Sequence, residues 1–389
     1  MVSYYRIIRS FTGKCTFMKK LLLILLMLLA FVLPVSALAD APAVLAGVEL
    51  VPGYYLANDE DVLTADKPAI GGYAYLSKDG KTLTLNNFHN QGRAYEYDSY
   101  RNTALLINQP LVLQLEGVNT LKNGENKSSD AITLNADLTI QGSGSLTADA
   151  CYGIYGYNYD TTLTIAGGTL NIYGRAGDAV TMPGNISITG GQTIIKSEAD
   201  GIYHYGDTID ISGGELKVEA ADYAIFTRNN LTVSGGNVNA AGGNVAMYSG
   251  GVFTISGGNV NATGEGVGLY AGGKLNITGG VIDVTTSGMA FLVIQSLNCS
   301  LLKPDGVVID GPYMDYADLI ELNNNGQNPG QHTVHLPATP VVPVEPVAPA
   351  SHAVPAVPTT GDSAPIALWA ALAGLSAAGM LVIRRRRSV

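Results

Sequence analysis

Five aromatic residues recur at equivalent positions, and their regular spacing would suit stacking on sugar rings: Tyr155, Tyr203, Phe226, Tyr248 and Tyr270. Each follows a small residue and an aliphatic residue, as in Gly201-Ile202-Tyr203, and Thr181 and Leu292 hold the same place in two further segments. With the aliphatic residue pointing inward, we expect an outward ridge of aromatics beside a smooth trough of Gly and Ala. Aromatic faces stack on the C–H faces of sugars, and Tyr adds a hydroxyl. A ladder that only stabilises a sheet would give the same pattern, so both interpretations stay open.

Acidic residues gather just before these aromatic segments. Asp178 and Asp200 occupy the same place in successive segments, and Asp222 and Asn244 lie close by. Stacked carboxylates repel one another unless a cation lies between them, and Ca²⁺ accepts such oxygens together with Gly carbonyls. The alternative is that they are solvated turn residues, because Asp and Asn favour bends. We carry Ca²⁺ forward as a hypothesis.

A repeat of 22 or 23 residues places both the aromatic residues and the acidic residues at regular intervals. Its clearest unit is an alternating triplet followed by x-Gly-Gly, from Leu163-Thr164-Ile165 to Leu275-Asn276-Ile277. A second alternating piece follows each Gly pair, and the aromatic segment is the third. Period-two patterning with β-branched residues indicates strands, and a period of this length indicates a solenoid. We therefore predict an all-β, right-handed parallel β-helix with three short strands per coil.

The repeat covers residues 81–300 and predicts stacked columns of side chains. Aliphatic residues would form an inner column that ends at Cys299, an unreactive core residue: Ile140, Ile165, Ile188, Ile211, Val233, Ile255 and Ile277. The Gly pairs would supply positive φ at tight bends. The Asn pairs Asn237/Asn259 and Asn239/Asn261 would pair their amides, with sugar binding as the lesser use. Residues 40–80 and 301–335 would cap the two ends.

The repeat units, with Leu83-Thr84-Leu85-Asn86-Asn87, resemble β-helical carbohydrate-binding domains of bacterial surface proteins, including a calcium-binding type related in fold to pectate lyases. The resemblance implies binding of an extracellular polysaccharide. An enzyme would need more: two carboxylates for a glycosidase, or Ca²⁺ and a basic side chain for a lyase. Arg175, Lys196 and Arg228 form no recognisable cluster with the aspartates, and we expect His204 to be exposed. We favour a non-catalytic module, with a lyase-like or hydrolytic enzyme and a protein-binding adhesin as alternatives.

The two ends of the chain carry targeting signals. Residues 1–39 combine basic residues, a short apolar run and Ala37-Leu38-Ala39, which is typical of a secretory signal peptide, and Met18 is an alternative start. Residues 357–389 resemble the cell-wall sorting signal of the LPXTG family: the motif Val357-Pro358-Thr359-Thr360-Gly361, an apolar segment and an Arg tail. That resemblance implies cleavage by sortase after Thr360, linkage of Thr360 to peptidoglycan, and membrane contact only through the precursor's C-terminal segment. Val357 replaces the usual Leu.

Charge and composition limit the classes of molecule that the chain is expected to bind. The whole chain has a net charge of −10, which argues against nucleic-acid binding. Between residues 40 and 360 there are 13 basic and 31 acidic residues, so that part carries −18. Such a surface favours cations or neutral polymers as partners. Three Cys in 389 residues exclude a disulfide framework. The Pro-rich residues 336–358 predict an extended wall-spanning linker of roughly 70 Å.

Overall fold

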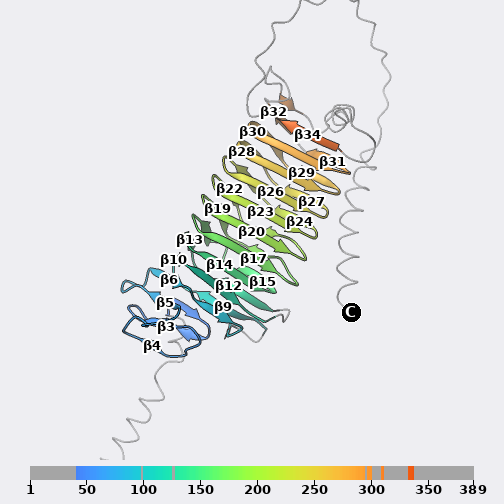
Figure 1. Cartoon of the computed structure of the whole chain (residues 1–389). Coiled ribbons are helices and arrows are strands. Elements are labelled where there is room, and N and C mark those ends of the chain that lie inside the picture. The colour runs from blue at the N-terminus through green and yellow to red at the C-terminus, as the bar shows by residue number, and fades with distance from the viewer. Residues whose placement is uncertain are drawn as a thin grey trace, which may run out of the picture. The chain divides into compact units, whose positions relative to one another are not determined.

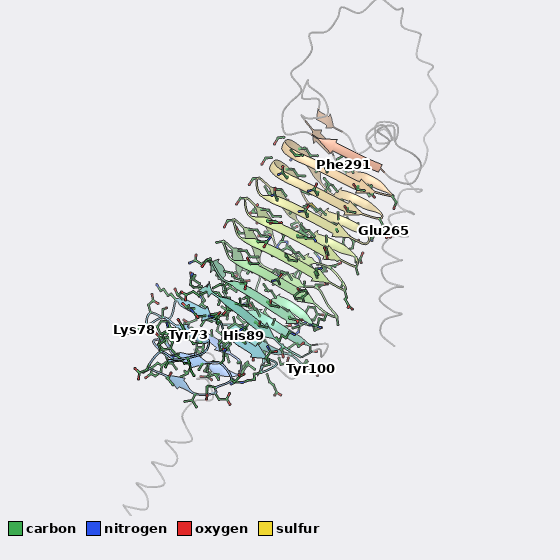
Figure 2. The ribbon with its side chains drawn as sticks, viewed as in Figure 1. Tyr73, Lys78, His89, Tyr100, Glu265 and Phe291 are labelled. Carbon is green, nitrogen blue, oxygen red and sulfur yellow. The ribbon has the colours of Figure 1, made fainter. Side chains whose placement is uncertain are left out.

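A computed structural model describes residues 41–97, 100–124, 128–293, 296–299, 308–310 and 332–336. These residues are all β, and their coils stack into a parallel β-solenoid (Figure 1), which confirms the predicted architecture. Each coil contributes one strand to a first sheet and two strands to a second, larger sheet. The amino-terminal segment with Tyr73 and Lys78 and the late coil with Phe291 lie at opposite ends of the solenoid (Figure 2).

The first sheet is built from the strands that carry the recurring aromatic residues. Its parallel strands are β9 (Asn102–Ile107), β12 (Ser129–Leu134), β15 (Tyr152–Gly156), β18 (Val180–Met182), β21 (Ile202–His204), β24 (Tyr223–Thr227), β27 (Val245–Ser249), β29 (Val267–Ala271) and β31 (Met289–Val293).

The second sheet holds the other two strands of each coil. The first of these are β6 (Thr82–Asn86), β10 (Leu111–Glu116), β13 (Leu138–Gly142), β16 (Thr162–Ile165), β19 (Asn185–Ile188), β22 (Thr208–Ile211), β25 (Asn230–Val233) and β32 (Ser296–Cys299). Those that follow the bend are β7 (His89–Gln91), β11 (Val118–Lys122), β14 (Ser145–Ala150), β17 (Thr169–Gly174), β20 (Gln192–Ser197), β23 (Glu215–Ala220) and β26 (Asn237–Gly242). In two coils both strands run together, as β28 (Phe253–Gly264) and β30 (Lys274–Thr286).

Antiparallel strands cover the edges of the outer coils. At the amino-terminal end, β1 (Ala43–Leu45) pairs with β9 and with β2 (Val48–Glu49), β5 (Tyr73–Leu76) pairs with β6, and β3 (Tyr55–Ala57), β4 (Leu63–Thr64) and β8 (Tyr95–Glu96) complete the segment. At the other end, β33 (Val308–Asp310) pairs with β32 and β34 (His332–Leu336) with β30. Where an edge is paired in this way, its backbone groups cannot recruit another chain.

The core is a set of aliphatic columns that run through the coils. The predicted column from Ile140 to Ile277 is in register, fully or almost fully buried, and continues along the backbone to Cys299. The side chain of Cys299 lies outside the described part. Burying such columns removes apolar surface from water and supplies most of the stability of the array. Cys151 is a free, buried thiol whose pKa is raised by burial.

Each Gly pair serves the bend in two ways. The second Gly of the pair has positive φ, for example +76° at Gly214, as predicted. The first Gly lets coils approach closely, because a Cβ on Gly213 would lie 2.4 Å from the carbonyl oxygen of Thr189. The repeated Gly pairs therefore fix both the turn and the spacing of the coils.

Several predicted segments lie outside the described residues. These are the signal peptide (1–39), the sorting signal (357–389) and all of the Pro-rich linker except Leu336, which ends β34. Among the residues that the structure describes, we find no helix with the length and apolarity needed to cross a membrane.

Candidate functional site

The predicted aromatic residues form one column on the outer side of the first sheet. Tyr203 pairs with Phe226, Phe226 with Tyr248, and Tyr248 with Tyr270. Thr181 occupies the same column between Tyr155 and Tyr203. The aromatic side chains are half-buried, whereas the aliphatic residues before them are fully buried. We call Tyr155, Tyr203, Phe226, Tyr248 and Tyr270 the aromatic ladder.

Four rings of the aromatic ladder stack on one another. Ring centroids are 5.0 Å apart for Tyr203–Phe226, 4.7 Å for Phe226–Tyr248 and 4.3 Å for Tyr248–Tyr270, with interplanar angles of 7°, 13° and 13°. Both faces of Phe226 and Tyr248 are therefore covered by neighbouring rings. Tyr203 and Tyr270 end the stack, so each keeps one face that no ladder ring covers. Cross-strand stacking is thus present, and sugar binding by these residues stays a prediction.

Tyr155 belongs to a separate cluster because Thr181 interrupts the stack. Its ring lies 5.6 Å from Tyr152 and 5.0 Å from Tyr157, both in edge-on geometry. The guanidinium of Arg101 lies 3.7 Å from the centroid of the Tyr155 ring, a cation–π contact. The ladder therefore offers two regions: a stacked column of four rings and a tyrosine cluster with an arginine.

The predicted trough of small residues beside the ladder is wrong. Its alanines are completely buried: Ala179, Ala224 and Ala246. A Cβ on Gly201 would lie 2.2 Å from Cγ1 of Val218, in the interior. The strand starts at a bend, so two successive residues, Gly201 and Ile202, face the core. These small residues make room for the opposite wall of the solenoid and offer no surface to a ligand.

The expectation that His204 is exposed is also wrong. Its side chain is 0% exposed, with Nδ1 2.7 Å from the Thr227 hydroxyl and Nε2 2.8 Å from the Gly184 carbonyl oxygen. A carbonyl can only accept, so Nε2 carries the proton and donates it, and the Thr227 hydroxyl donates to Nδ1. Burial lowers the pKa of His204 to about 4, which keeps the imidazole neutral. His204 is thus a satisfied core residue.

The acidic residues before the aromatic strands make main-chain contacts between coils. The Asp200 N–H donates to Oδ1 of Asp178 (3.3 Å), and the Tyr223 N–H donates to Oδ1 of Asp200 (3.0 Å). Asp222 and Asn244 are exposed. Within the described residues, no three or more His, Cys, Asp or Glu side chains are grouped so that they could hold a metal. Calcium binding at Asp178 and Asp200 stays a prediction that needs carbonyl or water ligands as well.

The Asn pairs on the second sheet use their amides for pairing. Nδ2 of Asn259 donates to Oδ1 of Asn237 at 2.7 Å, and Nδ2 of Asn261 donates to Oδ1 of Asn239 at 2.9 Å. These bonds confirm the prediction that the Asn columns serve packing between coils.

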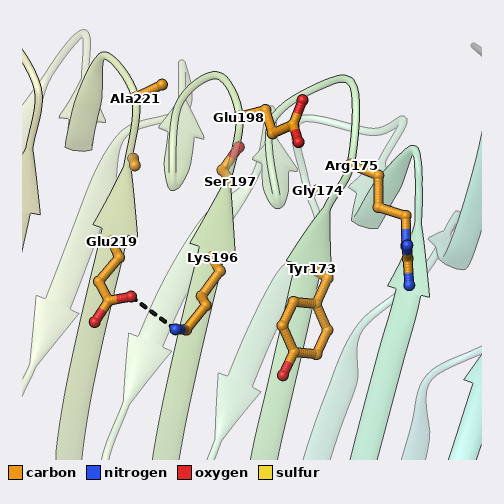
Figure 3. A pocket seen from close by; sticks show the side chains of 9 residues that line it. Tyr173, Gly174, Arg175, Lys196, Ser197, Glu198, Glu219 and Ala221 are labelled. Carbon is orange, nitrogen blue, oxygen red and sulfur yellow. Dashed lines mark ion pairs between the residues drawn. The ribbon is translucent and has the colours of Figure 1, made fainter.

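A groove that was not predicted from the sequence follows the bend after the second strand in the coils from β17 to β30. One hollow of about 830 Å³ involves Tyr173, Lys196 and Glu219 (Figure 3), and a second of about 520 Å³ continues past Thr263 to Ser287. The two hollows share Glu219 and Ala220 and follow one another along the solenoid, and we call them together the groove. Glu265, which also lines it, projects from the bend (Figure 2).

The column of residues beside the groove could have been found from the repeat. Tyr173, Lys196 and Glu219 each lie five residues after the second Gly of a pair, and the strand register places them side by side. The same column continues through Ala241, Thr263 and Thr285. The sequence therefore contained the column, but the hollow beside it depends on the path of the bend.

In a comparison with protein-family models, residues 109–249 and 204–300 match one family. The family is that of carbohydrate-binding domain-containing proteins. The match to this carbohydrate-binding family includes both the aromatic ladder and the groove. Searches of curated proteins and of solved structures gave no match. The family match indicates polysaccharide binding on the solenoid and favours a binding role.

The basic residues considered for catalysis have structural partners. Arg175 pairs with Asp149, which is not one of the aspartates considered for calcium. Burial would raise the pKa of Asp149, but Arg175 and Lys122 outweigh it and hold that pKa below its usual value. Lys196 pairs with Glu219 at 2.8 Å, and Arg228 donates to the Tyr203 hydroxyl at 3.2 Å. Each base therefore has a partner among the described residues.

Proposed function

We propose that this chain is a cell-wall-anchored surface protein whose solenoid binds extracellular polysaccharide without catalysing a reaction. The proposal is carried by one observation: the match to the carbohydrate-binding family spans an in-register, half-buried aromatic ladder. A column that follows the solenoid axis suits a linear polymer, because successive strands lie about 4.8 Å apart, close to the length of one sugar unit.

The stacking geometry assigns different contacts to different rings. The outer faces of Tyr203 and Tyr270 adjoin Thr181 and Leu292, so a sugar would stack over these smaller side chains, whereas Phe226 and Tyr248 present only ring edges. Each contact is weak, so several coils must act together to give useful affinity. The aromatic ladder should therefore favour polysaccharides over monosaccharides.

The targeting signals add the cellular context to the proposal. Residues 1–39 would direct export, and sortase would join Thr360 to peptidoglycan after cleaving the motif from Val357 to Gly361. Many copies fixed side by side on one wall would bind a long polymer with added avidity. Calcium at Asp178 and Asp200 would be a structural ion between coils.

The test compares the full chain with Tyr203→Ala/Tyr270→Ala in affinity electrophoresis against soluble linear polysaccharides. We expect the double variant to stay folded, with a melting temperature lowered by the two lost ring contacts, and to bind several-fold more weakly at a temperature where it is fully folded, because each lost aromatic contact is worth about 0.5–1.5 kcal/mol. Tyr54→Ala is the matched control, since Tyr54 is 40% exposed in the amino-terminal segment.

Three results would contradict the proposal. Wild-type protein that binds no polysaccharide would leave the protein-binding adhesin as the better account. Equal binding by the double variant and the Tyr54→Ala control would move the site away from the aromatic ladder. Release of unsaturated or reducing-end products from the polysaccharide would favour the enzyme.

A further inference from the structure

The groove beside Tyr173 has the dimensions of a site for an extended polymer. It follows one column of residues through six strands, from Tyr173 to Thr285, which is roughly 24 Å at about 4.8 Å per step. Its floor is lined by small residues: Gly174, Ser197, Ala220, Gly242 and Gly264. A chain lying along the axis would thus meet similar surroundings at each coil.

Tyr173 supplies an aromatic wall that is available for stacking. In the part of the chain that the structure describes, its half-buried ring makes no contact with another aromatic ring. Figure 3 shows it in line with Lys196 and Glu219 on neighbouring strands. By contrast, both faces of Phe226 and Tyr248 in the aromatic ladder are covered. A sugar ring in the groove can therefore use a face of Tyr173.

The charges that line the groove nearly cancel one another. Arg175 and Lys196 stand against Glu198, Glu219 and Glu265, which leaves a net charge of −1 on the lining. Most of these charges are held in ion pairs, since Glu219 pairs with Lys196 at 2.8 Å and Arg175 pairs with Asp149. In a chain that is otherwise strongly acidic, this strip carries little net charge yet is rich in donors and acceptors.

We propose that this groove is a second polysaccharide site, which takes an uncharged linear chain lying parallel to the solenoid axis. The ion-paired side chains bind sugar hydroxyls, and Tyr173 stacks on one sugar ring. The inference rests on the proposed function and adds a site that is separate from the aromatic ladder, because the two lie on different sheets. One solenoid could then hold two polymer chains at once.

The test blocks the groove and leaves the aromatic ladder intact. Ala241→Trp places a large ring at an outward-facing position in the middle of the groove, and Ser212→Trp places the same ring at an exposed position outside it. Both variants are made in the full chain, alone and on the Tyr203→Ala/Tyr270→Ala background. Tyr173→Ala is a third variant that removes the wall without adding bulk. Binding is measured by affinity electrophoresis against a neutral xylan and against polygalacturonate, with melting temperatures as the control for folding.

We expect Tyr173→Ala to weaken neutral xylan binding about two- to tenfold, the size of one lost aromatic contact. Ala241→Trp should abolish the xylan binding that remains in the ladder variant, whereas Ser212→Trp should not. If wild-type protein binds polysaccharide and Ala241→Trp and Tyr173→Ala bind like Ser212→Trp, the groove inference fails and the proposed function stands. If groove-dependent binding is seen only with polygalacturonate, the assigned ligand class is wrong. If wild-type protein binds neither polymer, the proposed function fails with it.

Discussion

The buried imidazole of His204 links the stability of the solenoid to pH. Its pKa is lowered from 6.5 to about 4 by burial, so between these values the unfolded chain binds a proton that the folded chain does not. Stability must therefore fall as the pH is lowered from about 6.5 to about 4. At 1.36 kcal/mol per pKa unit, the loss is roughly 3 kcal/mol.

Urea unfolding at a series of pH values checks this prediction. His204→Gln keeps hydrogen-bonding groups near Thr227 and Gly184 but cannot titrate. We expect the wild-type protein to lose more free energy of unfolding than the variant on going from pH 7 to pH 4. Parallel pH dependences for the two proteins would show that His204 is not the group responsible.

The calcium hypothesis rests on the carboxylates of Asp178 and Asp200. An ion that binds only the folded solenoid stabilises it by mass action, so chelation with EDTA should lower the melting temperature. Asp178→Asn should reduce the difference between the curves recorded with calcium and with EDTA. Identical melting curves, together with metal analysis that finds no calcium, would remove the ion from the account.

At the scale of the strands, the sequence predicted the columns well because the repeat length fixes the register. Apart from the longer steps Ile140–Ile165 and Tyr155–Thr181, the aromatic ladder, the Asn pairs and the inner column of Ile residues follow from one offset of 22 or 23 residues. The wrong predictions concern residues whose orientation depends on more than strand alternation. The predicted trough of small residues is wrong because a bend turns both Gly201 and Ile202 inward.

The expectation that His204 is exposed was wrong for a different reason. Alternation along β21 places His204 on the inner side with Ile202, but its polarity suggested exposure. The Thr227 hydroxyl and the Gly184 carbonyl satisfy both ring nitrogens, so burial costs no lost hydrogen bond. Such a partner in the next coil cannot be deduced from a single strand.

The Gly pairs give a prediction at this scale. Gly214→Ala puts a Cβ at φ +76° and 2.7 Å from the carbonyl carbon of Gly190. We expect it to lower the free energy of unfolding by at least about 1–2 kcal/mol, the cost of the left-handed conformation for an L residue, because the contact with Gly190 adds to that cost. Ser212→Ala, two residues earlier and exposed, should change it by less than about 0.5 kcal/mol. Equal denaturation midpoints for both variants would mean that the bend does not depend on Gly.

For the whole molecule, the proposed anchor would place the solenoid outside the cell. Gly361→Ala alters the motif at the proposed cleavage bond, so the variant should stay with the membrane fraction, whereas wild type should be released from the wall by muramidase. Thr333→Ala, outside the motif, is the control and should behave as wild type. Release of Gly361→Ala and wild type to the same extent would contradict sortase attachment.

The most direct test of the central claim is a glycan array probed with the purified, folded chain. Polysaccharide binding along the solenoid predicts signal on linear oligosaccharides and polysaccharides that grows with chain length, little signal on monosaccharides, and a clear reduction for Tyr203→Ala/Tyr270→Ala. An array on which the folded wild-type chain gives no signal above background, or the same signal for monosaccharides and polymers, would contradict it.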